Sequence, residues 1–270
     1  MPPPRPSRNA AWKPLFDACF AGDDEQLRVL LKAGADPNQV APSEWRQRPL
    51  HRVCEYRISA PKHAGHDRCI DLLLTAGADP TLRANVTNMR PVELAALAGM
   101  EKAAARLQGE GPDIFAAAAV GDAVRVATIL RRRPAAAKQV DEAGCSALWY
   151  GAASRVSTSH PRKDRWGTAG ILLDAGADPN TTGIGVPALH MALGHTRNFA
   201  LAEILLLRGA DLNANTSLLH SACAFHFEFL QEGLEWLASH GADLSPCLEK
   251  AESLRYHKIA RWLRDRHKTS

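Results

Sequence analysis

The tripeptide Gly-Ala-Asp occurs five times in this chain, and each copy follows a run of apolar residues. The copies begin at Gly34, Gly77, Gly176, Gly209 and Gly241. The last two intervals are 33 and 32 residues. Periods of this size are typical of stacked arrays, in which each unit buries its apolar face against its neighbours. Glycine also favours the left-handed C-cap of a helix, so the five glycines predict five helix ends.

A second motif follows three of these copies and places a histidine next to a leucine. It reads Arg48-Pro49-Leu50-His51, Val186-Pro187-Ala188-Leu189-His190 and Ser217-Leu218-Leu219-His220. Proline fits the first turn of a helix because it has no N–H to lose there. A helix opened by this motif, then a second helix and then Gly-Ala-Asp, resembles the ankyrin repeat family over nearly the whole chain. The resemblance implies that the motif histidine bonds backbone in a neighbouring turn, with no catalytic or metal-binding role.

The expected fold is therefore an all-α ankyrin-repeat solenoid of about seven repeats with a C-terminal helical cap. The first helices begin near Leu15, Leu50, Val92, Ile114, Leu148, Leu189 and Leu219. Corresponding positions in repeats one and four, two and five, and three and six lie 99, 98 and 97 residues apart, which indicates a duplicated triplet. We expect a flexible Pro-rich leader at 1–10, repeats one to three at 11–110, repeats four to seven at 111–246 and basic capping helices at 247–270.

Repeats two and five each contain an inserted segment between their two helices, at 57–68 and 155–166. Both segments start Arg-Ile-Ser or Arg-Val-Ser and carry Asp-Arg near their ends. Loops longer than a fold requires are either functional or tolerated. Duplication would copy a harmless insertion as well as a useful one, so both interpretations stay open.

The resemblance also implies where a partner would bind, because ankyrin arrays use the tips of their connecting loops, or fingers, and the exposed face of the first helix. The candidate partner-binding residues are Trp45, Arg46, Arg52, Glu55, Tyr56, Arg57, Trp149, Tyr150, Arg155, His195 and Phe225. Trp, Tyr and Arg are the residues most often found as interface hot spots. Trp149 stands where the motif has histidine, so we expect the histidine's backbone bond to be lost there and the ring to be packed or to contact a partner.

Composition sets limits on location and chemistry. The formal charge is +4, and residues 249–268 hold seven Lys or Arg against three Asp or Glu, so the basic cap accounts for it. No apolar run approaches the ~20 residues that span a bilayer, and the N-terminus lacks the apolar core of a secretory signal. The six scattered cysteines favour packed, reduced thiols over disulfides or zinc. We expect a cytoplasmic monomer without cofactor or metal.

The leading functional hypothesis is a non-enzymatic intracellular protein-binding module, an adaptor or inhibitor, of which an immunity-type protein is one version. Because the expected walls of the concave face are rich in arginine, the partner should have an acidic surface. The alternative is a repeat protein that binds nucleic acid or a phosphorylated ligand, or an enzyme with its site in the concave groove. The carboxylates there show no spacing that identifies a reaction, so whether the chain is an enzyme stays open.

Overall fold

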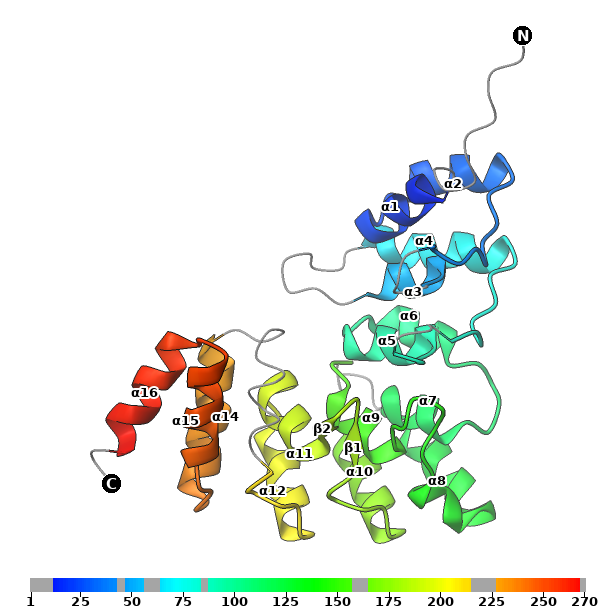
Figure 1. The fold of residues 1–270 in the computed structure, drawn as a ribbon. Helices are drawn as coiled ribbons and strands as arrows, with labels where there is room; N and C mark the ends of the chain where they lie inside the picture. Colours follow the sequence, from blue (N-terminus) through cyan, green and yellow to red (C-terminus); the bar gives the residue numbers. More distant parts are fainter. Residues whose placement is uncertain are drawn as a thin grey trace. The chain divides into compact units, whose positions relative to one another are not determined.

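The computed structural model describes residues 12–42, 47–55, 64–83, 87–156, 165–214 and 227–267 (Figure 1). Contacts divide the chain into two compact units, Met1–Pro112 with Ser154–His160, and Asp113–Ala153 with Pro161–Ser270. Most described residues are helical, and the named strands among them form one short hairpin. The all-α fold class is confirmed at this level.

The first unit contains three successive helix pairs. They are α1 (Lys13–Ala21) with α2 (Asp24–Lys32), α3 (Pro49–Cys54) with α4 (Ala64–Thr75), and α5 (Pro91–Leu97) with α6 (Glu101–Leu107). Helix α3 packs against both α1 and α5, while α4 packs against α2 and α6. The first helices therefore form one layer and the second helices another, as the stacked pairs in Figure 1 show.

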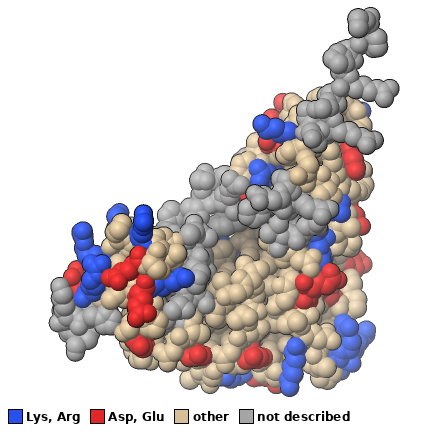
Figure 2. Space-filling model, viewed as in Figure 1, with Lys and Arg blue, Asp and Glu red and all other residues tan. Residues whose placement is uncertain are grey.

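The second unit by itself also has a layer of first helices and a layer of second helices. Its elements are α7 (Ile114–Ala119), α8 (Ala123–Arg132), the 3-10 helix η1 (Pro134–Lys138), α9 (Ala147–Ala153), α10 (Arg165–Asp174), β1 (Thr182–Gly183), β2 (Val186–Pro187), α11 (Ala188–His190), the π-helical turn η2 (Met191–His195), α12 (Phe199–Leu207), α14 (Phe227–Ser239), α15 (Ser245–Ser253) and α16 (His257–His267). Helix α9 contacts α7 and α11, and α10 contacts α8 and α12. The last two helices pack on each other, and Figure 2 shows Lys and Arg projecting from this pair with Asp and Glu between them.

The five Gly-Ala-Asp glycines adopt the conformation that the sequence predicts. Their φ angles lie between 85° and 92°, and each follows the last turn of a second helix. The aspartate two residues later accepts a hydrogen bond from the backbone N–H two residues further on, at 2.8 or 2.9 Å in every copy. Each copy thus forms one compact turn that ends a helix and starts the next connection.

Asparagine side chains connect some of these turns to the next one. Asn38 donates from Nδ2 to the carbonyl of Gly77 at 2.8 Å, and its Oδ1 accepts from the N–H of Asp79 at 2.8 Å. Asn180 makes the corresponding pair of bonds to the following turn, at 3.0 and 2.7 Å. Asn213 accepts from the next aspartate N–H at 3.1 Å. The turns therefore bond side by side along the array as well as within themselves.

The five cysteines among the described residues are buried, and none of them forms a disulfide with another described residue. Burial raises the pKa of Cys69 and of Cys247 to about 12, so these thiols stay protonated at neutral pH. Cys223 lies outside the described residues. Within the described ranges, no helix is both long and apolar enough to cross a membrane.

Candidate functional site

Arg52 and Glu55, two of the predicted partner-binding residues, lie together at the end of α3. They form an ion pair, and their side chains are 22% and 21% exposed. The Arg52 guanidinium also lies 4.2 Å from the ring centroid of Phe20, at the end of α1. Ion pair and cation–π contact hold the guanidinium in one place while part of it remains exposed. Phe20 was not singled out from the sequence, since only this cross-repeat contact brings it to the site.

Arg155 follows α9 in the sequence but lies beside the end of α5, the next helix in the layer that contains α1 and α3. Its backbone N–H donates to the carbonyl of Ala96 at 2.9 Å. Gly99 permits this approach, because a Cβ at that position would lie 3.2 Å from the Arg155 carbonyl oxygen. The backbone of Arg155 is thereby fixed while the side chain is exposed. Phe20, Arg52, Glu55 and Arg155 thus mark the ends of three successive helices, and we call them the helix-end surface.

The end of the first inserted segment has a structural role. His66, in the first turn of α4, is buried and its Nε2 lies 3.0 Å from the carbonyl oxygen of Phe20. Arg68 forms an ion pair with Asp24 of α2 at 2.9 Å. These contacts join α4 to the preceding helix pair, so at least this part of the insertion supports the fold next to Arg52.

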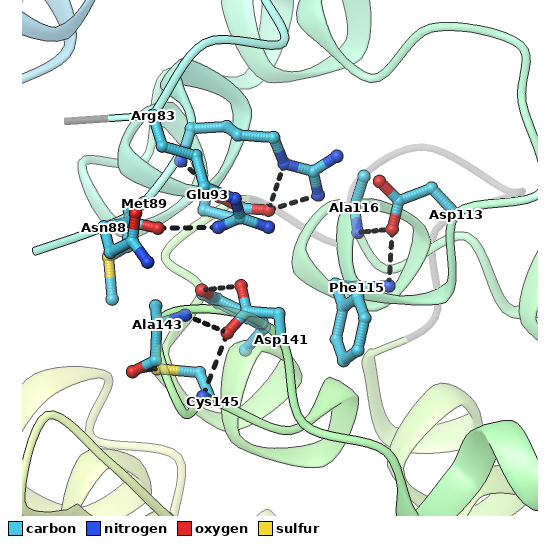
Figure 3. Close-up of polar contacts among 12 residues, drawn as sticks. Arg83, Asn88, Met89, Glu93, Asp113, Phe115, Ala116, Asp141, Ala143 and Cys145 are labelled. Carbon is cyan, nitrogen blue, oxygen red and sulfur yellow. Dashed lines mark hydrogen bonds and ion pairs between the residues drawn. The ribbon is translucent and has the colours of Figure 1, made fainter.

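Trp149 and Tyr150 do not lie on a surface, which corrects their assignment as partner contacts. Both side chains are 0% exposed. The Tyr150 hydroxyl donates to Asp141 Oδ2 at 2.9 Å, and the Asp141 carboxylate also accepts from the N–H groups of Ala143 and Cys145 (Figure 3). The two rings meet edge to face with centroids 5.4 Å apart. They form the interior of the second unit around α9.

The expected loss of the motif-histidine bond at Trp149 is also wrong. His51 lies with Nε2 3.1 Å from the carbonyl oxygen of Met89, 38 residues later. Trp149 Nε1–H donates to the carbonyl of Val186 at 2.8 Å, 37 residues later. Each carbonyl lies four residues before the next motif-histidine position, Met89 before Glu93 and Val186 before His190. The indole of Trp149 therefore makes the bond that the imidazole of His51 makes.

His190 and His195 are both buried. His195, predicted to contact a partner, is 8% exposed within η2, which corrects that assignment. Among the described residues, neither ring nitrogen of His190 has a hydrogen-bond partner. Burial lowers the pKa of His190 to about 4, so the ring is neutral at pH 7. The remaining candidates, Trp45, Arg46, Tyr56, Arg57 and Phe225, lie outside the described residues.

Glu93 is a buried carboxylate that the sequence analysis did not single out. It stands at the motif-histidine position of α5, is 0% exposed and forms an ion pair with Arg90. Its Oε1 accepts from Arg90 Nε at 2.8 Å and its Oε2 from the Arg90 N–H at 2.5 Å (Figure 3). Burial raises the pKa of Glu93, and the guanidinium opposes this shift. The signal available in the sequence was an acid at the histidine position three residues after an arginine.

The comparisons do not assign the chain to a known group. No family model matches it, and a search of curated proteins finds no significant match. Within the described ranges, no three His, Cys, Asp or Glu side chains are grouped so that they could hold a metal ion. The geometry of the helix-end surface is therefore the basis for a functional proposal.

Proposed function

We propose that this chain is an ankyrin-type solenoid that binds another protein, and that the helix-end surface of the first unit takes part in binding. The architecture is supported by the recurrence of one turn geometry. Five glycines have left-handed φ, and five aspartates close the same two-residue turn. The single observation that carries the function is the arrangement of Arg52, held by Phe20 and Glu55 and still exposed.

Preorganisation explains why such an arginine suits recognition. An arginine on a free helix loses side-chain rotamer entropy when it binds a partner. Arg52 has already lost much of that freedom, because the Phe20 ring and the Glu55 carboxylate hold its guanidinium. The planar guanidinium can then bond a carboxylate of the partner in a bidentate manner.

The charge of the surface supports an acidic partner. Arg52 and Arg155 are two partly or fully exposed cations near the ends of neighbouring helices, and Arg52 pairs with Glu55. A surface of this sign raises the association rate of an acidic protein and disfavours a basic one. The proposal is thus an adaptor or inhibitor whose partner presents carboxylates to α3 and α5.

Photo-crosslinking of the full chain tests this proposal. A benzophenone side chain at position 155 in an extract of the source cells should yield one crosslinked protein, which unlabelled chain competes away. The matched comparison places the same group at Val124, which is 67% exposed on α8. Arg52→Gln should reduce the crosslink from position 155, whereas Arg132→Gln, at the exposed end of α8, should not. Equal yields from positions 155 and 124, or no effect of Arg52→Gln, would reject the surface.

A further inference from the structure

The last helical pair carries most of the net charge of the protein. Residues 249–267 hold six Lys or Arg against three Asp or Glu, a surplus of three in a chain of net charge +4. One of these acids, Glu252, already pairs with Arg264 at 3.0 Å. A local surplus of this kind attracts polyanions and leaves open which kind of polyanion binds.

The arrangement of α16 narrows this choice. Its apolar side chains Ile259, Ala260 and Leu263 are buried. Lys258, Trp262 and Arg266 follow one another at intervals of four residues, so they share another face of the helix, about 6 Å apart along its axis. We call these three residues the basic stripe.

Trp262 is the informative member of the basic stripe. Its ring is half-buried, and the Arg266 guanidinium lies 5.7 Å from the ring centroid. Lys258 and Arg266 are exposed on either side of it, and Arg261 is exposed next to it in the sequence. One part of the indole packs in the fold, and the other part is exposed between two cations. Aromatic rings alternating with cations are typical of proteins that bind single-stranded nucleic acid, because bases stack on the ring while cations contact phosphates.

The competing polyanions fit this helix less well. A membrane surface would require apolar side chains free to insert, but Ile259 and Leu263 are buried within the fold. An acidic protein would also pair with these cations, but single-stranded nucleic acid uses the flat face of the indole and the flanking cations together. We therefore propose that α16 binds single-stranded nucleic acid, with one base stacked on Trp262 and phosphates on Lys258, Arg261 and Arg266.

The experiment uses the full chain and fluorescence anisotropy with a labelled 15-nucleotide oligo-dT. Lys258→Gln with Arg261→Gln should weaken binding at least tenfold and reduce the salt dependence by about 0.7 per lost phosphate contact. The matched control, Arg131→Gln with Arg132→Gln, removes two exposed cations from the end of α8 and should leave affinity unchanged. Equal losses in both double variants would indicate a diffuse charge effect and overturn the site.

Stacking needs its own test, because phosphate contacts would also tolerate a backbone without bases. An abasic 15-mer should bind about tenfold more weakly than oligo-dT, and Trp262→Leu should remove that difference while Trp262→Phe retains it. Thermal melts monitored by circular dichroism confirm that each variant is folded. Equal affinity for the abasic strand, or no binding of oligo-dT at 50 mM salt, would refute the proposal. The residues tested here differ from those of the helix-end surface, so either proposal can fail without the other.

Discussion

The contact between Gly183 and Trp149 gives the sharpest test of how the second unit is held together. Gly183 lies in β1, against the face of the indole. A Cβ at this position would lie 2.5 Å from Trp149 Cδ2, 2.6 Å from Cε2 and 2.7 Å from Cys145 Sγ. Gly183 is not among the glycines with positive φ, so alanine would meet this crowding without additional backbone strain. Any cost of Gly183→Ala therefore measures the packing of the hairpin on Trp149 and Cys145.

The magnitudes follow from the burial of the two residues. Overpacking of a buried site costs about 1–3 kcal/mol, which we expect for Gly183→Ala. Trp149 is 0% exposed, and truncating a buried tryptophan to alanine costs about 3–5 kcal/mol. Trp149→Ala removes two of the three close contacts and leaves a cavity into which the Cys145 side chain can shift, so Gly183→Ala should cost less than about 0.5 kcal/mol in that background. The expected coupling free energy is thus about 1–3 kcal/mol.

Urea denaturation followed by circular dichroism at equilibrium measures all four proteins of this double-mutant cycle. Gly170→Ala in α10 is the matched control, since no atom within 4 Å would meet its Cβ. That substitution should stabilise the protein by about 0.5–1 kcal/mol, because alanine is the better helix former. Additivity of the two substitutions within about 0.5 kcal/mol would refute the proposed packing of the hairpin on the indole.

Three further predictions concern the buried histidines, the buried carboxylate Glu93 and the bridging Asn180. Burial lowers the pKa of His51 and His190 from 6.5 to about 4. As the pH falls, the unfolded chain therefore binds protons before the folded chain does. Each histidine should remove about 2 kcal/mol of stability between pH 7.5 and 5. Urea midpoints across this range should fall less steeply in His190→Gln, and an unchanged slope would contradict this. Glu93→Leu leaves the Arg90 guanidinium without its buried partner and should lower the free energy of urea unfolding by about 3–5 kcal/mol. A loss below about 1 kcal/mol would contradict a structural role of this ion pair. Asn180→Ala removes two hydrogen bonds between successive turns and should cost about 1–2 kcal/mol of stability. The backbone amide of Asp211, which donates to Asn180, should then exchange its hydrogen faster, and an unchanged exchange rate would contradict the bridge.

Local chemistry made part of the fold predictable from the sequence. Gly34 and its four counterparts have left-handed φ because the end of a helix is commonly closed in that conformation, and glycine adopts it without a Cβ clash. Proline before an apolar residue, Leu50 in α3 and Val92 in α5, marks the start of each helix for the same kind of reason. In both cases the residue that decides the conformation lies within a few positions of the effect.

The candidate site was less predictable, because exposure depends on residues far away in the chain. Trp149 looked like a contact residue, yet Gly183 and Val186, more than thirty positions later, enclose its ring and accept its N–H. Arg52 is partly exposed, and its guanidinium is held by Phe20 of the preceding helix pair. A spacing rule within one repeat carries no information about such neighbours.

The motif-histidine position and the residue after it differ in what the fold requires of them. His51 and Trp149 bond equivalent backbone carbonyls, those of Met89 and Val186, with different rings. Glu93 at the equivalent place pairs with Arg90 instead. All three side chains are buried, so this position meets structural demands and tolerates several chemistries. Arg52 follows one of these residues directly and makes contacts that no turn or cap requires. Arg52 is thus held in place although the packing of the helices does not require it. Residues with these two properties are the best candidates for a partner-specific role.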